Sequence, residues 1–379
     1  MAPSRPEKKE KPSAGALLDD AETLFEVGNI EEAISLADKA LATTGEGGDF
    51  ELRAVNLLAI LHIEDGEVEE ARSLFERAAN IDKNGEMDEK VGGGPDKFLF
   101  LAELSEEGGQ DTVKWFERGA TALRKQIQNL DSISSKTPEQ QAAYDEKQKK
   151  LGGVLCAVAE VYMTDLSWEE DAEQRCEALI TEAMMIAPGS SETWQTVANV
   201  RISQERNDEA RTALKRSLEL WQDLAPEDPA VPDFSTRIAL ARLLLETDLM
   251  ADALVVLERL VTDDDESIEA WYLGGWALYL AGEKFRDAKR STNGDGPSED
   301  LRTAWKSSRR WLAQCLKLFE AQEYEDERLG EHAVELVLSI NEEIGEPEEG
   351  EDEWDVASDD EDDEEENQEE EDDDEEMKD

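Results

Sequence analysis

ALLDDAETLFEVGNIEEAISLADKAL (residues 16–41) and AVNLLAILHIEDGEVEEARSLFERAA (residues 54–79) share one skeleton. Each stretch holds an apolar helical segment, a glycine at a turn, an acidic pair before an alanine, and a second apolar helical segment. Self-similarity at a fixed period indicates a repeat protein, so these two stretches decide the fold. The matching residues, each pair 38 positions apart, are Gly28 and Gly66, Ala33 and Ala71, and Ala40 and Ala78.

The skeleton returns twice later in the sequence. It is carried by TWQTVANVRISQERNDEARTALKRSLELW (193–221) and TRIALARLLLETDLMADALVVLERLV (236–261), with equivalent alanines at Ala210 and Ala253. Apolar residues recur at intervals of three and four along these stretches, and the alternation of period two that predicts strands is missing. The spacing predicts an all-α protein built from helix pairs.

These stretches resemble the tetratricopeptide repeat, a helix–turn–helix unit of about 34 residues. In that family a bulky residue, a small residue, an alanine and a second small residue follow one another at fixed positions. The small residues let two helices approach closely, and the bulky ones fill the groove between them. The matching residues in three units are Leu17, Ala21, Ala33 and Ala40; Val55, Ala59, Ala71 and Ala78; and Trp194, Ala198, Ala210 and Ser217.

Three further units depart from the pattern but keep its helices. The unit at 98–123 has a shortened turn, and the unit at 154–188 has about five extra residues in its turn. The unit that begins at Ile268 opens into an insertion, 283–299, before its second helix. A last amphipathic stretch, 327–345, is typical of the cap that solenoids need for solubility.

The resemblance therefore implies a superhelical solenoid of about seven helix pairs with a C-terminal capping helix over residues 14–345. A basic arm, 1–13, and an acidic tail, 346–379, flank it, and both are expected to be disordered because they offer too little apolar surface to fold. Thr137 and Pro138, with Gln140 three residues after Thr137, predict the capped start of a long helix.

Charge narrows the classes of partner. The chain has 96 acidic and 39 basic side chains, a formal net charge of −57, of which the tail (346–379) supplies −23. Nucleic acid and anionic membranes are bound through Lys and Arg, so neither is expected as a partner. No apolar run approaches the roughly 20 residues of a membrane helix, and the start lacks the apolar stretch of a secretory signal. A strongly basic protein is the natural complement.

Signs of catalysis are missing from the sequence. The two histidines lie on apolar helical stretches, and the glycines at 91–97 lack the spacing of a phosphate loop, so they predict a flexible connector. Three cysteines, Cys156, Cys176 and Cys315, form no CxxC pair and are expected to be buried thiols. We expect no enzyme activity, no cofactor and no metal.

The resemblance places binding of extended peptides on the inner face, which the first helix of each unit lines. That face is predicted to be acidic; the alternative is an ordinary solvated helix face. Leu18 and Glu22 stand where co-chaperones that hold an acidic peptide carry cations, so that function is excluded. The predicted client-binding residues on this face are Glu22, Glu26, Glu64, Glu103, Glu107, Glu160 and Glu246, with Asn199 and Arg242 as the exceptions in charge.

The unit at 268 adds an aromatic stripe. Trp271 stands at a core position, which leaves Tyr272, Trp276 and Tyr279 on another face at helical spacing. Two interpretations are open. The stripe packs against the insertion or the capping helix, or it is a shelf that binds the stems of Arg and Lys through stacking and cation–π contact.

Repeats, acidic body and acidic tail together resemble the tetratricopeptide-repeat assembly chaperones dedicated to the large-subunit ribosomal protein numbered four in the universal scheme. The resemblance implies a monomer that binds this newly made basic protein, chiefly its long internal loop, in the acidic groove. It implies passage from cytoplasm to nucleus, with an import receptor engaged through the client. A histone chaperone and a repeat scaffold in a nuclear processing complex are the alternatives, since histones are also basic.

Overall fold

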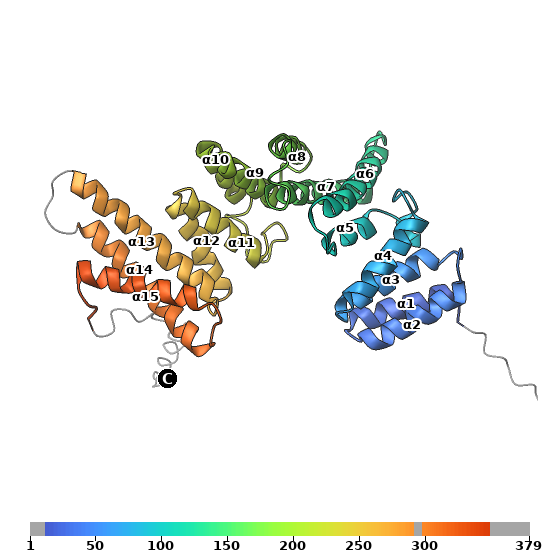
Figure 1. The fold of residues 1–379 in the computed structure, drawn as a ribbon, viewed down its shortest axis with the longest axis horizontal. Coiled ribbons are helices and arrows are strands. Elements are labelled where there is room, and N and C mark those ends of the chain that lie inside the picture. Colours follow the sequence, from blue (N-terminus) through green and yellow to red (C-terminus); the bar gives the residue numbers. More distant parts are fainter. Residues whose placement is uncertain (1–11, 292–297, 349–379) are drawn as a thin grey trace, which may run out of the picture. The chain divides into compact units, whose positions relative to one another are not determined.

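The computed structural model describes residues 12–291 and 298–348. These residues form fifteen α-helices and one short 3₁₀ helix, η1, and no strand. Seven consecutive helix pairs and a terminal helix, as the resemblance implied, make up this part of the chain (Figure 1). The predicted all-α class and the number of pairs are confirmed.

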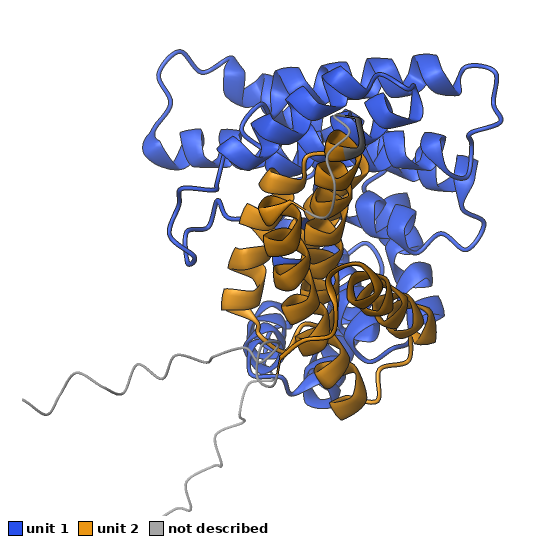
Figure 2. Ribbon diagram, turned by 90° about the vertical axis from the view of Figure 1, so that its left-hand side faces the viewer, with its two compact units in different colours: residues 1–236 blue, residues 237–379 orange. Residues whose placement is uncertain are grey.

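The chain divides into two compact units, residues 1–236 and 237–379 (Figure 2). Unit 1 contains five helix pairs, and neighbouring helices in it pack against each other along the chain. Its helices are α1 (Ala14–Glu26), α2 (Ile30–Thr44), α3 (Glu51–Glu64), α4 (Val68–Ile81), η1 (Glu89–Val91), α5 (Asp96–Glu103), α6 (Gly109–Asp131), α7 (Pro138–Met163), α8 (Ala172–Ile186), α9 (Ser191–Ser203) and α10 (Asn207–Glu219).

Unit 2 is built around two long helices. Its helices are α11 (Phe234–Glu246), which begins just before the boundary, α12 (Met250–Asp263), α13 (Ile268–Ser291), α14 (Glu299–Ala321) and α15 (Glu327–Ile344). Glycines let α13 lie close to α14: a Cβ on Gly274 would stand 2.1 Å from the Trp311 ring, and one on Gly282 would stand 2.2 Å from Trp305.

The small residues of the repeat pattern make the core. Ala21 and Ala33 pack with Leu17 and Leu18 in the first pair, and all four side chains are buried. The other alanines of the repeat pattern, in this pair and in later ones, are likewise inaccessible to solvent. An alanine has no side chain beyond Cβ, so the two helices of a pair approach closely and exclude water between them. Those fully covered alanines are Ala40, Ala59, Ala71, Ala78, Ala198, Ala210 and Ala253.

The long helix α7 begins as predicted. The Thr137 side chain accepts a hydrogen bond from the Gln140 amide, and the Gln140 side chain accepts one from the Thr137 amide. Pro138 occupies the first turn, where its missing N–H costs nothing. These contacts satisfy backbone donors at the helix start and fix the direction in which the chain enters.

Two sequence predictions are corrected by the fold. The insertion after α13 begins later than expected, because α13 continues through residue 291, and only 292–297 lie outside the described residues. The glycine-rich segment is an ordered connection rather than a flexible one. The Asn56 amide donates to the Gly92 carbonyl at 2.6 Å, and a buried ion pair, Lys97 Nζ to Asp82 Oδ2 at 2.8 Å, holds the segment against unit 1.

All three cysteines are buried, as predicted. Burial raises the pKa of Cys156 to about 11 and that of Cys315 to about 12. The pKa of Cys176 is also raised, chiefly by burial.

Helix α1 begins at Ala14 behind the capping side chain of Ser13, and α15 ends at Ile344, next to the predicted limits of the solenoid. The predicted arm up to residue 11 and the predicted tail from residue 349 lie outside the described residues. Within the described part of the chain, no helix combines the length and apolar character required to cross a membrane.

Candidate client-binding surface

The first helices of unit 1 are linked to one another along one side. The Arg53 guanidinium of α3 reaches α1, where it contacts Asp19 Oδ1 and Glu22 Oε2, each at 2.7 Å. Lys150 of α7 pairs with Asp96 of α5. These polar contacts join α1 to α3 and α5 to α7, and we call the band of first-helix side chains that carries them the first-helix face of unit 1.

Thr196 extends this band to α9. Its hydroxyl donates to Glu160 Oε1 of α7 at 3.3 Å. Asn199, a predicted site residue, lies half-buried one turn further along α9. Glu22, Glu160 and Asn199 of the predicted residues thus lie on the first-helix face, together with two cations that the sequence prediction missed, Arg53 and Lys150.

Three predicted carboxylates occupy equivalent places on this face. Glu26, Glu64 and Glu103 are the last residues of α1, α3 and α5, and all three are exposed. The carbonyl end of a helix carries partial negative charge, so an acidic side chain there destabilises the helix by about 0.3–1 kcal/mol. These glutamates do not stabilise their own helices, and their repetition makes the face a row of negative charge.

The pKa values of two carboxylates of the row, Glu103 and Glu160, are shifted by their surroundings. Desolvation raises the pKa of Glu103 above its ordinary value, although nearby Lys150 opposes the shift. Desolvation also raises the pKa of Glu160, against the hydrogen bond from Thr196. A partly desolvated carboxylate interacts more strongly with an approaching cation than one in bulk water does.

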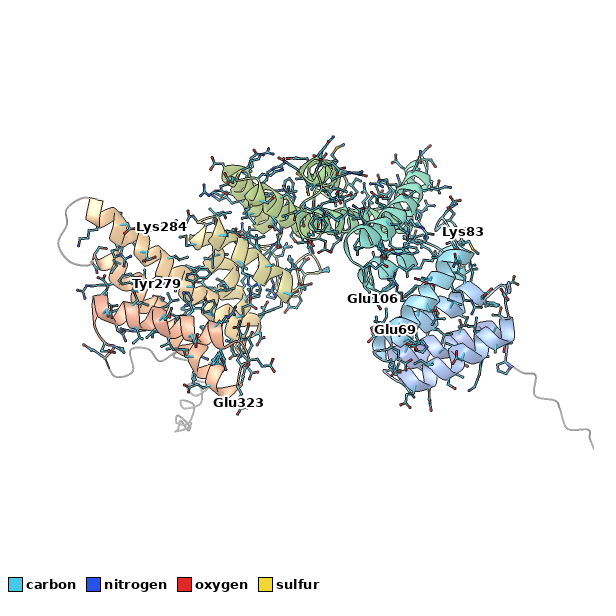
Figure 3. The ribbon with its side chains drawn as sticks, viewed as in Figure 1. Glu69, Lys83, Glu106, Tyr279, Lys284 and Glu323 are labelled. Carbon is cyan, nitrogen blue, oxygen red and sulfur yellow. The ribbon has the colours of Figure 1, made fainter. Side chains whose placement is uncertain are left out.

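The structure corrects two of the predicted assignments. Glu107 does not lie on a first helix, because α5 ends at Glu103; it lies in the loop before α6, next to Glu106, which is labelled in Figure 3. Glu22 is on α1 as predicted, but Arg53 already neutralises it. The prediction missed this pair because the two residues are 31 positions apart in the sequence.

Both parts of the solenoid are acidic. Residues 14–236 contain 47 acidic and 21 basic side chains, a net charge of −26, whereas residues 237–345 contain 23 and 13, a net charge of −10. In unit 2, Glu246 is exposed at the end of α11, and Arg242 pairs with Glu269 at 2.6 Å. Per residue the two stretches carry similar charge, about −0.12 and −0.09, and the tail (346–379) adds −23 to unit 2.

The aromatic stripe of unit 2 packs against the capping helix α15, which is the first of the two interpretations drawn from the sequence. Tyr272 OH lies 2.7 Å from His332 Nδ1 of α15, and Tyr279 OH lies 3.0 Å from Ser339 Oγ of the same helix. The Trp276 ring meets the His332 ring edge-on, with ring centroids 6.0 Å apart.

Tyr279, labelled in Figure 3, also stacks on Trp305 of α14, with centroids 5.7 Å apart. The stripe lies half-buried between α14 and α15 and contacts a cluster that includes Leu312 and Leu336. An open aromatic shelf is therefore wrong as a description of this face. Tyr272, Trp276 and Tyr279 attach the capping helix.

Neither histidine lies in a metal cluster. Among residues 12–291 and 298–348, no group of three or more His, Cys, Asp or Glu side chains is arranged to hold a metal ion. His62 Nδ1 contacts Glu67 at 2.8 Å across the turn after α3. Both imidazoles thus make contacts within the fold.

Comparison with known proteins gives a consistent set of relatives. Residues 18–86, which cover most of α1 to α4, match the family model of the tetratricopeptide repeat. The "Probable assembly chaperone of rpl4" of Emericella nidulans is 45% identical over 354 residues, covering 89% of this chain and 87% of the relative. The protein of the same name in Schizosaccharomyces pombe is 30% identical, covering 86% and 91%.

A solved structure agrees with these relatives. The structure of "Assembly Chaperone of RpL4 (Acl4) (Residues 1-338)" is 56% identical to this chain and superimposes with a TM-score of 0.69. It covers 73% of this chain and all of the solved one. Sequence and fold therefore point to the same group of proteins.

Proposed function

This chain belongs to the family of assembly chaperones of rpl4, and we propose from that membership that it is a dedicated chaperone of the ribosomal protein Rpl4. The client is newly made Rpl4, bound chiefly through a long basic internal loop. A loop shaped to lie against RNA is basic and unfolded until RNA neutralises it. The chaperone shields that loop until assembly.

The observation that carries the mode of binding is the row of carboxylates on the first-helix face of unit 1. Glu64 and Glu103 end successive first helices and have no cation paired with them among the described residues. A basic segment laid along this face neutralises the row and replaces its water. Exposed ion pairs contribute only about 0–1 kcal/mol each, so the charge mainly speeds capture and keeps binding reversible.

The proposal extends to oligomeric state, enzyme activity, other partners and localisation, and it rests on the acidic surface of the chain. The protein acts as a monomer without enzyme activity, since capture and release of a basic chain need no chemical step. It binds no nucleic acid or membrane directly. It accompanies its client from the cytoplasm to the nucleus, where an import receptor engages the client, and RNA in the pre-ribosome takes over the basic loop.

Binding kinetics with Rpl4 test the role of the row. The variant Glu64→Lys/Glu103→Lys/Glu160→Lys should slow association at low salt by about tenfold or more, because steering by charge supplies about 10–10³-fold in rate. The matched control, Asp38→Lys/Glu117→Lys/Glu219→Lys, makes the same change in net charge on second helices of unit 1. It should slow association less than threefold.

Equal slowing by both triple variants would show that the whole acidic surface attracts the client and that the first-helix face has no special role. Purification of the native complex followed by mass spectrometry tests the client itself. Rpl4 as the main partner is expected. Histones in its place would overturn the proposed function.

A further inference from the structure

The turn between α7 and α8 is longer than that of the other pairs and carries an exposed aromatic. Residues 164–171 fill it, and Trp168 within it is 74% exposed. Four of the seven other residues of this turn are acidic: Asp165, Glu169, Glu170 and Asp171. At this exposure the Trp168 ring gains little from burial, so it contributes little to stability and is free to contact a ligand.

A cavity of about 440 Å³ opens beside this turn. It lies in unit 1 among α7, α8 and α9, which pack together (Figure 1). Its apolar lining comes from side chains of all three helices, and its polar lining comes from residues at the helix ends and turns. The lining residues are Tyr162, Met163, Ser167, Ala172, Glu173, Cys176, Val200, Ser203, Gln204 and Glu205.

Two carboxylates of the lining are available to a ligand. Glu173, in the first turn of α8, and Glu205, in the turn after α9, are exposed and have no cation paired with them among the described residues. Glu177 on the same helix is different, because Arg201 and Arg206 pair with it at 2.6 and 2.7 Å. The charge of the cavity therefore rests on Glu173 and Glu205.

Burial is the main influence on the two ionisable groups of the lining. It raises the pKa of Cys176, and Glu177 and Glu173 add to the shift. It also raises the pKa of Tyr162, against Arg175 and with smaller contributions from acidic neighbours that include Asp171 and Glu169. Both groups therefore remain neutral, and the exposed carboxylates Glu173 and Glu205 supply the negative charge of the lining.

We propose that this cavity, which we call the α7–α9 pocket, is a second docking site that takes an arginine or lysine side chain of a basic polypeptide. Both this pocket and the row of carboxylates lie toward the C-terminal ends of first helices, but the pocket is lined by α7, α8 and α9 and the turns after α7 and α9, and none of its lining residues belongs to the row. The inference rests on the proposed function for the class of partner, a basic unfolded segment.

The lining suits the two parts of such a side chain. The aliphatic stem packs on Met163, Ala172 and Val200, and the cationic head lies toward Glu173 and Glu205. Trp168, next to Ser167 of the lining, offers its ring face to a neighbouring cation, an interaction worth about 0.5–1 kcal/mol at an exposed site. Contacts of this kind survive salt better than charge alone, since apolar burial is not screened.

Methyl NMR of the full chain can observe the pocket directly. The protein has seven methionines, so ε-¹³C-methyl labelling gives a simple spectrum, and a Met163→Leu variant assigns the peak of Met163. The probe is a capped heptapeptide of alternating glycine and arginine, and its citrulline counterpart has the same shape without charge. The arginine peptide should shift the Met163 peak in a saturable way, at least fivefold more tightly than the citrulline peptide.

Met185 is the internal control, because it lies 78% exposed at the other end of α8. Its peak should stay in place. Glu173→Gln/Glu205→Gln should weaken the peptide at least fivefold at the Met163 peak. Glu31→Gln/Glu69→Gln removes the same charge from exposed sites in the first turns of α2 and α4 and should weaken it less than twofold.

An unmoved Met163 peak, or equal weakening by both glutamine pairs, would overturn the pocket. These outcomes are separable from those for the proposed function. If Rpl4 binds the full chain and the peptide leaves Met163 unmoved, only the pocket is wrong. If the peptide titrates Met163 as expected and Rpl4 does not bind, the proposed client is wrong and the pocket stands.

Discussion

The row of carboxylates in unit 1 and the aromatic stripe in unit 2 both have the spacing of one helix face in the sequence, but only the row is exposed in the structure. Both lie on first helices, away from the residues that close each helix pair. Glu64 and Glu103 remain exposed, whereas the aromatic stripe is half-buried against α15: Tyr272 and Tyr279 hydrogen-bond to it, and the Trp276 ring meets His332. Helical spacing identifies which residues share a face. It does not identify what covers that face.

The cause lies in the position of each helix along the chain. Helix α13 belongs to the last pair, so its exposed apolar side chains would have no following unit against which to pack. Terminal repeats of a solenoid need a cap with a polar outer side. The stripe meets that need by fastening α15, and the apolar side chains that looked suited to ligand binding serve the fold.

The largest effect expected concerns the two tryptophans of α13. Trp271→Ala should lower the free energy of unfolding by about 3–5 kcal/mol, because the ring is buried against Trp311 with centroids 4.8 Å apart. Trp276→Ala should lower it by about 2 kcal/mol through loss of contact with His332. Chemical denaturation of both variants gives these values, and Rpl4 association measures function.

A Trp276→Ala variant with the wild-type free energy of unfolding but without Rpl4 binding would contradict the packing role of the stripe. The stripe would then be a binding surface in spite of α15. A variant on the outer side of the cap, Glu335→Ala, is the control and should change neither quantity by much, since that side chain is exposed.

A buried carboxylate in unit 1 should behave oppositely to the exposed row. Asp82 pairs with Lys97 and also accepts hydrogen bonds from the amides of Glu86 and Gly94. Lys97→Met leaves this carboxylate buried without its cation, which should cost about 3–5 kcal/mol. By contrast, Glu64→Lys/Glu103→Lys should change stability by less than about 0.5 kcal/mol or raise it slightly, because a cation suits the end of a helix.

Thermal unfolding of these variants separates carboxylates that hold the fold from those available to a client. Acid adds a second measurement. Burial alone would raise the pKa of Asp82, but Lys97 and the amides of Glu86 and Gly94 together outweigh it, and the pKa is lowered. The stability that this pair contributes is present above the unfolded-state pKa of Asp82 and is lost as pH falls through the lowered value. In Lys97→Met this acid-dependent loss should become smaller.

The row itself should respond to mild acid. The pKa values of Glu103 and Glu160 lie above the ordinary 4.5, so these carboxylates lose charge at higher pH than fully solvated glutamates do. Association with Rpl4 should slow as pH falls from 7 toward 5. The variant Glu103→Gln/Glu160→Gln should associate more slowly at pH 7 and lose less over that range; an unchanged pH profile would contradict a role for these two residues.

The smallest effect on stability is expected at the turn between the two helices of a pair, where one residue has a positive φ. Gly28 and Gly66 follow first helices with φ of 78° and 81°, whereas Glu205 and Asp248 have φ of 59° and 65° at the corresponding turns. Left-handed backbone favours glycine, so Glu205→Gly and Asp248→Gly should each stabilise the fold by about 0.5–1 kcal/mol.

The two variants should differ in binding. Glu205→Gly removes a carboxylate of the α7–α9 pocket and should weaken the arginine peptide at the Met163 peak, while Asp248→Gly in unit 2 should not. Thermal shift assays and the NMR titration together measure both effects. Loss of stability in Glu205→Gly would show that the side chain makes a contact worth more than the strain.

Repeat spacing was sufficient to predict most of the fold. The alanine positions fixed the helix pairs, and Thr137 with Gln140 fixed the start of α7, because both signals are local in sequence. Glu107 was misplaced because α5 ends at Glu103, and the local signal for this break, Gly108 and Gly109 with φ of 62° and 48°, was not used. Arg53 and Lys150 were missed because each pairs with a residue more than thirty positions away, and the pocket was missed because three helices build it together.

The protonated state of the buried thiols has a practical consequence. With pKa values of about 11 and 12, Cys156 and Cys315 are thiolates in fewer than about one molecule in 10⁴ at pH 7, and the thiolate is the form that reacts. Maleimide dyes should therefore label a cysteine introduced at Trp168 or Glu64 while Cys156 and Cys315 stay unmodified. Cys176 lines the α7–α9 pocket, so it is the one native thiol to replace before fluorescence is used to report the distance between client and chaperone.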